Sequence, residues 1–232
     1  MDANIIENIP FSADKPGFLE LLRIRPGSRQ AVEFEELLDA ACDIARPKAA
    51  FRAAYLEDSH EDSVTIEGNL FSSRVLKTNL EETHVVFPFI ATCGTELQEW
   101  AATMQNTLHC FWADNIQLMA LGCAVAALDA HLKEVTGSKM LSSMHPGSLE
   151  DWPLTEQIPL FKLLGEAPGR IGVHLTESML LVPLKSISGI QFVSEEGFLN
   201  CRLCPREKCP ARRSPYERDL LEKKYTARTP HT

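Results

Sequence analysis

A strand-like apolar segment that leads directly into a long alanine-rich helix limits the possible folds more than any other feature. Residues 84–91 have the composition of a buried β-strand, and Cys93-Gly94-Thr95-Glu96 has the pattern of a turn into a helix. Thr95 is the expected N-cap of a helix that ends near residue 104, and a longer helix is expected at residues 108–135, before Gly137. The small residues along this longer helix indicate close packing in the middle of the fold.

The remaining segments mix helical and strand-like sequence without a regular alternation of strand and helix. This mixture argues against a doubly wound parallel sheet and predicts the α+β class. Helices are expected at residues 14–22, 28–45, 72–80 and 154–164, strands at residues 50–56, 64–66, 171–175 and 186–193, and a loop at residues 143–153. Residues 1–198 are interpreted as one domain, and residues 199–232 as a cysteine-rich and then basic, helical tail.

Charge is distributed unevenly along the 232 residues. The formal net charge is −9, but residues 201–232 contain nine Lys and Arg against four Asp and Glu, which leaves residues 1–200 at −14. An acidic body disfavours nucleic acid as a partner, because its carboxylates repel phosphates. The basic tail is interpreted as a solvated helix, with contact to an acidic partner or a phosphate as the alternatives.

Neither a membrane span nor a secretion signal is expected. The longest nearly uncharged apolar run, residues 116–128, is shorter than the roughly 20 residues that cross a bilayer. The first residues lack the basic start and apolar stretch of a secretion signal, which predicts a cytoplasmic protein. In that compartment the seven cysteines are expected to be thiols or metal ligands.

Three cysteines in the tail form the sharpest local motif. Cys201, Cys204 and Cys209 have the spacing C-x2-C-x4-C, and two cysteines separated by two residues can direct both sulfurs at one metal. We therefore predict zinc or an iron–sulfur cluster at these cysteines, with Cys93 as a candidate fourth ligand. The alternatives are an open fourth position for a substrate or redox partner, three unligated thiols in a polar tail and, for Cys93, a small buried thiol.

Other motifs that could carry chemistry are weak or absent. The acids and the histidine of Asp58-Ser59-His60-Glu61-Asp62 lie between two expected strands and are interpreted as a solvated turn. The chain has neither a G-x-G-x-x-G dinucleotide fingerprint nor a G-x4-G-K-[S/T] phosphate loop. From the residues alone, the sequence therefore indicates an α+β domain with a metal or cluster site.

Several motifs resemble one known family. The motifs are Leu175-Thr176-Glu177-Ser178 followed by Pro183 and Ser186-Ile187-Ser188-Gly189, His145-Pro146-Gly147-Ser148 followed by Asp151-Trp152-Pro153-Leu154, and Ala91-Thr92-Cys93-Gly94-Thr95-Glu96-Leu97. Together they resemble the activation domain of cobalamin-dependent methionine synthase, in its standalone form, over residues 15–198. The resemblance implies a central, mostly antiparallel sheet with packed helices, and the cysteine-rich tail lies outside it.

The resemblance also implies a ligand and a partner. Domains of this family bind S-adenosylmethionine (AdoMet) and sit over a corrinoid whose cobalt has been oxidised to Co(II). A one-electron donor such as flavodoxin reduces the cobalt, and the methyl group of AdoMet is then transferred to it. Carried over by position, the AdoMet-binding residues are Ser143, Pro146, Gly147, Ser148 and Glu177. The cobalamin is expected on a partner methyltransferase, because the segment that resembles the activation domain takes up nearly all of these 232 residues.

One departure from the family keeps several functions open. The family has an arginine three positions before its Pro-Gly pair and a tyrosine directly after it, whereas this chain has Ser143 and Ser148 there, with Lys139 as a nearby cation. The first hypothesis is a standalone accessory protein that supports reductive methylation of a Co(II) corrinoid, with an iron–sulfur cluster in the tail delivering the electron. The second is a non-catalytic binding or scaffold module with a structural zinc site. A third is an AdoMet-dependent methyltransferase that acts on another acceptor.

Overall fold

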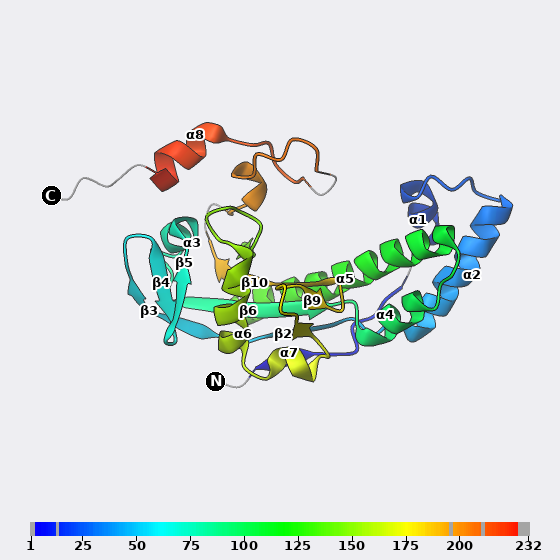
Figure 1. Cartoon of the computed structure of the whole chain (residues 1–232), viewed down its shortest axis with the longest axis horizontal. Coiled ribbons are helices and arrows are strands. Elements are labelled where there is room, and N and C mark those ends of the chain that lie inside the picture. Colours follow the sequence, from blue (N-terminus) through cyan, green and yellow to red (C-terminus); the bar gives the residue numbers. More distant parts are fainter. Residues whose placement is uncertain (1–2, 13, 195–196, 210–211, 227–232) are drawn as a thin grey trace.

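Strand β6 (Val85–Thr92) is the central strand of the fold in the computed structural model, which describes residues 3–12, 14–194, 197–209 and 212–226 (Figure 1). One edge of β6 pairs with β10 (Ser186–Val193), and the other pairs with β2 (Lys48–Phe51) and then β3 (Ala54–Ser59). Four strands extend the sheet outward: β1 (Asn4–Ile6) beside β2, β4 (Ser63–Ile66) and β5 (Asn69–Ser72) beyond β3, and β7 (Leu141–Met144) beside β10.

Every strand pair of this sheet is antiparallel. Within the described residues, the eight strands form one sheet, and β8 (His174–Leu175) and β9 (Leu181–Val182) form a separate hairpin. The predicted α+β class with an antiparallel sheet is therefore confirmed.

The side chains of β6 alternate between two cores, because successive residues of a strand point to opposite faces. Phe87, Phe89 and Ala91 belong to the buried cluster that includes residues of helix α5, whereas Val86 and Ile90 belong to the cluster on the other face. All five side chains are buried, so both faces of this strand are covered. A continuous apolar run such as residues 84–91 is typical of a strand in this position.

Helices α1 (Lys15–Leu21), α2 (Arg29–Ile44) and α4 (Thr95–Ala102) gather at one end of the sheet with the first part of α5 (Thr107–Thr136), which then runs along the sheet (Figure 1). Their shared core includes Phe34 and Trp112, whose rings meet edge-on with 5.5 Å between centroids. Ser28 and Asn106 cap α2 and α5 through side-chain oxygens, and Gly137 ends α5 with a φ of 66°. The observed bounds of these two helices differ from the predicted ones by one residue at each end.

Helix α5 is long and apolar enough, by length and composition, to cross a membrane, and among the described residues it is the one helix that meets this test. It is longer than the apolar run at residues 116–128 because it continues through polar and charged positions at both ends. Its buried residues Ala124, Leu128 and Leu132 pack in one cluster with Phe51 and Phe89 of the sheet. A core helix has the same composition, so these properties alone do not assign α5 to a membrane.

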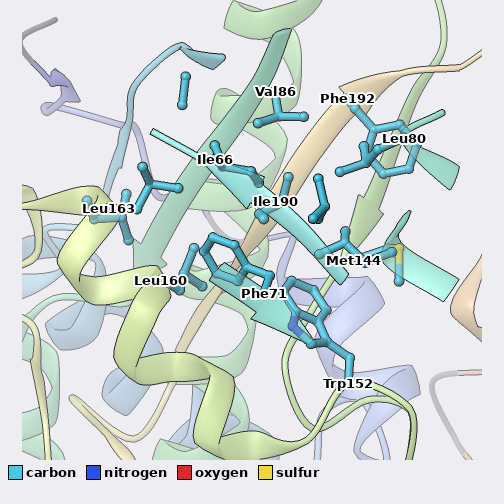
Figure 2. Close-up of a cluster of buried hydrophobic side chains, with 14 of the residues drawn as sticks. Ile66, Phe71, Leu80, Val86, Met144, Trp152, Leu160, Leu163, Ile190 and Phe192 are labelled. Carbon is cyan, nitrogen blue, oxygen red and sulfur yellow. The ribbon is translucent and has the colours of Figure 1, made fainter. Parts of the chain in front are cut away.

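Short helices from the middle of the chain cover the opposite face of the sheet. They are α3 (Arg74–Asn79), the 3-10 helix η1 (Leu154–Glu156), α6 (Gln157–Leu164) and α7 (Ala167–Arg170). Figure 2 shows their core, in which Phe71 lies between Leu160 and Trp152. Trp152 is 1% exposed, and its ring meets that of Phe71 edge-on with 6.4 Å between centroids. This packing holds the loop that precedes η1.

The tail folds back onto this second core. It contains η2 (Asn200–Arg202), α8 (Arg218–Leu220) and the π-helical turn η3 (Leu221–Thr226). Leu203 and Tyr225 are each 3% exposed and belong to the same cluster as Trp152. The Tyr225 hydroxyl also donates a hydrogen bond to Asn79 Oδ1 at 2.9 Å. The described tail is therefore anchored to the domain at two points, and residues 227–232 of the predicted tail lie outside the described residues.

Two predicted strands differ from the observed elements, because tertiary contacts override the local pattern. Of the residues 171–175 expected as a strand, residues 171–173 form a turn, in which the Val173 N–H donates to the Pro168 carbonyl at 2.8 Å, and only the two residues of β8 are extended. The strand expected at residues 50–56 is divided into β2 and β3 at Arg52, whose guanidinium donates to the Leu163 carbonyl at 3.0 Å.

Two further corrections concern residues of predicted sites. The N-cap of α4 is Gly94 and not Thr95, because the chain turns there with a φ of 97° and a Cβ at this position would lie 2.5 Å from the Arg46 carbonyl oxygen. Ser143 was expected in a loop but belongs to strand β7, where it pairs with Gln191 of β10.

Candidate functional site

A cavity of about 1260 Å³ lies between the loop that precedes η1, the start of α3 and the tail, and we call it the loop pocket. It exceeds the roughly 300–1,000 Å³ of typical ligand pockets. Its lining residues are Asp62, residues 72–75, residues 147–151, residues 153–154, residues 203–206, Tyr216 and Tyr225. The pocket therefore brings the predicted AdoMet-binding loop and the cysteine-rich tail to one place, although they are distant in the chain.

The loop side of the pocket is fixed by backbone geometry and by one buried ring. Gly147 has a φ of 82°, a conformation that favours glycine, and its N–H donates to the Trp152 carbonyl at 2.7 Å. A Cβ at position 147 would also lie 3.0 Å from the Leu154 side chain. The Ser148 N–H donates to the His145 carbonyl at 3.1 Å, and the loop thus turns back on the buried Trp152.

The first turn of α3 is tied to the same loop through Asp151. Its carboxylate accepts hydrogen bonds from the Ser73 hydroxyl and from the Val75 N–H, the latter at 2.9 Å. Beside it, Arg74 donates from Nε to the Asp62 carboxylate, and this hydrogen bond raises the pKa of Arg74. The loop and the helix therefore form one connected wall, which carries charges of both signs.

Ser143 is engaged elsewhere, in a hydrogen-bonded chain at the edge of the sheet. His145 Nδ1 lies 3.0 Å from the Ser188 carbonyl oxygen, which can only accept, so this nitrogen carries the proton. His145 Nε2 then accepts from the Ser143 hydroxyl at 3.0 Å. Burial lowers the pKa of His145, which keeps the ring in this neutral form. Gly189, the residue after Ser188, lies so close to Met144 that a Cβ at position 189 would be 2.2 Å from the Met144 carbonyl oxygen.

Glu177 lies in the tight turn between β8 and β9 and is exposed. Thr176 holds this turn, because its hydroxyl accepts from the Leu180 N–H at 3.0 Å and its carbonyl accepts from the Met179 N–H at 3.0 Å. Of the five residues predicted to bind AdoMet, Gly147 and Ser148 line the loop pocket, and Pro146 is the buried residue that precedes them. Ser143 and Glu177 do not line it.

The three tail cysteines are not brought together as a metal site. In the part of the chain that the structure describes, no group of three or more His, Cys, Asp or Glu side chains is placed to hold a metal ion. The guanidinium of Arg212 instead donates to the backbone carbonyls of Cys201 and Cys204, at 2.9 and 3.0 Å, and to those of Arg206 and Ser214.

A cation of the chain itself therefore organises the segment in which a metal was predicted. The residues as arranged do not fit bound zinc or an iron–sulfur cluster, and the metal site at Cys201, Cys204 and Cys209 stays a prediction. Cys204 is the one of the three that lines the loop pocket.

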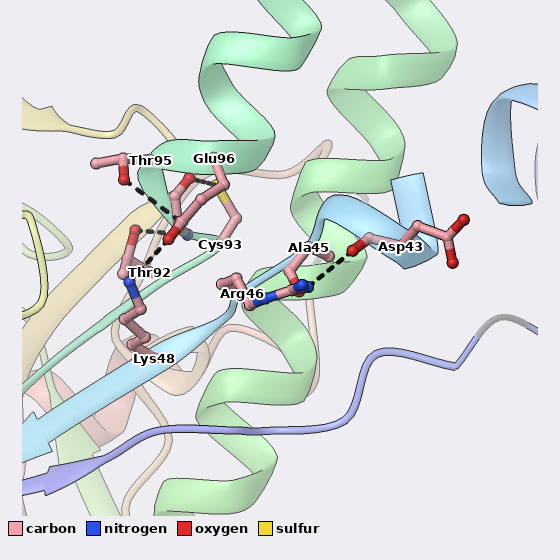
Figure 3. A network of polar contacts seen from close by, with 9 residues as sticks. Asp43, Ala45, Arg46, Lys48, Thr92, Cys93, Thr95 and Glu96 are labelled. Atoms are coloured by element: carbon pink, nitrogen blue, oxygen red, sulfur yellow. Dashed lines mark hydrogen bonds and ion pairs between the residues drawn. The ribbon is translucent and has the colours of Figure 1, made fainter. Parts of the chain in front are cut away.

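Cys93, the predicted fourth ligand, is a buried thiol in the core of the helical end of the molecule. It is 0% exposed, and burial raises its pKa to about 12. Figure 3 shows the turn around it, where Glu96 pairs with Lys48 at 3.1 Å and the Arg46 guanidinium donates to the Ala45 carbonyl at 2.7 Å. A thiol with this pKa stays protonated near neutral pH, so Cys93 fits a structural role.

Sequence reasoning missed two tail residues of the loop pocket, Arg206 and Tyr216. Both are exposed, and both face a cavity whose other wall is formed by residues 147–154. No motif marks them. The only local signal is the presence of Leu203 and Tyr225 in a highly charged segment, since apolar side chains in such a segment need a core to pack against.

Comparison with known proteins identifies the fold. No protein-family model and no curated protein matches the chain. A solved structure described as "Crystal Structure of the MetH Reactivation Domain bound to AdoHcy" is similar, with a TM-score of 0.62 and 14% sequence identity. The match covers 86% of this chain and 80% of that chain. The resemblance to the activation domain of cobalamin-dependent methionine synthase is thus confirmed at the level of the fold, and the chain has the fold of the MetH reactivation domain.

Proposed function

We propose that this protein binds AdoMet, and the S-adenosylhomocysteine (AdoHcy) left after methyl transfer, in the loop pocket. The observation that carries the proposal is the position of Gly147 and Ser148, which line a cavity of about 1260 Å³ in a chain with the fold of an AdoHcy-binding domain. The fold alone does not assign a ligand, so binding in the loop pocket has to be tested by experiment.

The chemistry of the pocket supports a ligand that carries both positive and negative groups. The wall of the pocket includes the carboxylates of Asp62 and Glu150 and the guanidinium of Arg74. AdoMet has a cationic sulfonium and ammonium and an anionic carboxylate, so the Glu150 carboxylate and the remaining N–H groups of Arg74, whose Nε pairs with Asp62, can bind opposite ends of it. A volume of about 1260 Å³ leaves room for a nucleoside with an amino acid attached.

The proposed partner is a methyltransferase that carries a corrinoid. In the proposed reaction a separate one-electron donor reduces the partner's Co(II) corrinoid, and the methyl group of AdoMet passes to the reduced cobalt, which leaves AdoHcy. This chain contributes binding and orientation, which lower the barrier by holding the methyl group in place. We assign no electron-transfer role to Cys201, Cys204 and Cys209, because their arrangement does not fit a cluster. We place the protein in the cytoplasm, as expected from its sequence.

The second candidate is a non-catalytic binding or scaffold module. It is favoured by the loop itself, which has serines, and neither a cation nor an aromatic ring, at positions 143 and 148. Ser143 is committed to His145, and Ser148 presents only a hydroxyl. On this hypothesis the protein uses the reactivation-domain fold without binding AdoMet or AdoHcy.

Isothermal titration calorimetry of the full chain with AdoHcy separates the two candidates. Ser148→Trp places a large ring in the loop pocket and is expected to weaken binding at least tenfold. The matched control is Thr78→Trp, which places the same ring in a second cavity, of about 870 Å³. Binding by wild type and by Thr78→Trp, with loss in Ser148→Trp, supports the proposal. No binding of AdoHcy or AdoMet by the wild type supports the scaffold module, and equal binding by both variants would place the ligand outside the loop pocket.

A further inference from the structure

We infer that the tail forms a ligand-binding wall of the loop pocket, in which Arg206 binds a carboxylate and Tyr216 packs against an aromatic base. The inference rests on the proposed function, because it names the residues that hold the two ends of AdoMet or AdoHcy. It also gives the tail, which lies outside the segment that resembles a known domain, a direct role in binding.

The first observation is that, within the described part of the chain, the Arg206 guanidinium has no partner, whereas those of Arg202 and Arg212 are engaged. Among the described residues, no hydrogen-bond or ion-pair partner is found for its exposed guanidinium, although it lines the loop pocket. Arg202 makes a bidentate ion pair with Glu217, at 2.7 and 3.0 Å, and Arg212 binds backbone carbonyls. Guanidinium groups bind carboxylates through two parallel N–H groups, so a free Arg206 at the cavity wall is suited to an anionic ligand.

The second observation is that Tyr216 presents an aromatic ring to the same cavity. The side chain is 39% exposed, and no described residue bonds its hydroxyl. A tyrosine ring offers a large, rigid surface against which a planar base can pack, and it loses little conformational freedom on binding. The cation and the ring therefore match two chemically different parts of one nucleoside-amino acid ligand.

The third observation is that the protein holds the backbone of both residues in position without a ligand. The Arg206 carbonyl accepts from the Arg212 guanidinium, and the next residue after Tyr216, Glu217, donates its N–H to the Arg202 carbonyl at 2.7 Å. Leu203 anchors the same segment in the core. Because the backbone is already ordered, ligand binding has to immobilise only the two side chains, which reduces its entropy cost and favours a binding role.

The test uses the full chain, two ligands and paired variants. AdoHcy carries both a carboxylate and an adenine, whereas 5′-methylthioadenosine has the adenine but no amino acid. Arg206→Gln is expected to lower the affinity for AdoHcy about tenfold, which corresponds to the loss of one charge-assisted hydrogen bond. The affinity for 5′-methylthioadenosine is expected to change by less than about twofold. Tyr216→Ala is expected to weaken both ligands, and Tyr216→Phe to retain both. The controls are Arg213→Gln, on the same tail, and Tyr55→Ala, on β3; neither residue lines the pocket.

The outcomes separate this inference from the proposed function. If wild type binds AdoHcy but Arg206→Gln and Tyr216→Ala bind it as tightly as their controls, the role of the tail is refuted and AdoHcy binding stands. If Arg206→Gln weakens both ligands equally, its assignment to the carboxylate is refuted. If wild type binds neither ligand, the inference and the proposed function fail together. Thermal unfolding of each variant identifies any loss that arises from misfolding.

Discussion

Replacing Gly189 with alanine should separate β7 from β10. A Cβ at position 189 would lie 2.2 Å from the Met144 carbonyl oxygen, 2.8 Å from His145 Nδ1 and 3.1 Å from Phe89 Cε1. Carbon–oxygen contacts of this kind normally measure about 3.3 Å or more, so the strands have to move apart by roughly 1 Å. The closest atom belongs to the backbone and cannot rotate away.

The expected loss of stability follows from three contributions. Overpacking a core position costs about 1–3 kcal/mol, and loss of the hydrogen bond from His145 to the Ser188 carbonyl adds about 0.5–1.5 kcal/mol. The alanine recovers about 0.4–1 kcal/mol, because it restricts the unfolded chain. The free energy of unfolding should therefore fall by about 2 kcal/mol, within limits of about 0.5 and 4 kcal/mol, and a loss of about 2 kcal/mol corresponds to a decrease in Tm of roughly 4–8 °C for a chain of this size.

The matched control is the same substitution at Gly122. This glycine lies in α5, is exposed, and has no atom within 4 Å of a Cβ position outside its own helix backbone. Gly122→Ala should raise the free energy of unfolding by about 0.5–1 kcal/mol, because alanine has the higher helix propensity. Urea unfolding followed by tryptophan fluorescence measures both variants. The reasoning is refuted if Gly189→Ala unfolds at the same urea concentration as wild type, or if the two substitutions change stability in the same direction.

Two other predictions concern ionisable groups. Burial lowers the pKa of His145 in the folded protein. As the pH falls below about 6.5, the unfolded chain therefore takes up a proton at His145 more readily than the folded chain does. The stability that depends on neutral His145 is present above this pH and is lost as the pH falls below it. From pH 7.5 to pH 5.5, the free energy of unfolding should fall more for wild type than for His145→Gln. Equal decreases in the two proteins would contradict this. Burial also raises the pKa of Cys93 to about 12, so iodoacetamide at pH 8 should modify the exposed Cys110 and leave Cys93 unmodified until urea is added. Mass spectrometry of the alkylated peptides measures this, and equal labelling of the two thiols in the folded protein would show that Cys93 is not sealed in the core.

The candidate site was only partly predictable from the sequence. Gly147 and Ser148 follow from resemblance to a known loop, and both line the loop pocket. Glu177 belongs to an equally similar motif, but the β8–β9 turn places it elsewhere. Arg206 and Tyr216 carry no motif, because their position depends on where the tail folds back and not on their neighbours in the chain.

The tail cysteines illustrate the same limit. The spacing C-x2-C-x4-C is a local pattern, and it correctly identifies a segment with a compact turn. The spacing does not show what organises that turn, and here the guanidinium of Arg212 binds the backbone carbonyls of Cys201 and Cys204. The metal site itself stays a prediction.

Local sequence patterns were enough to predict the fold class, the central strand and, to within one residue at each end, the bounds of α2 and α5. These features depend on interactions between residues close in the chain: the apolar run at residues 84–91, the caps at Ser28 and Asn106, and the left-handed Gly137. Three features depend on the tertiary structure: residues 171–173 turn, Ser143 pairs within a strand, and the tail reaches the loop pocket. The physical reason is that these contacts join residues far apart in the chain, and the burial of shared cores selects among them.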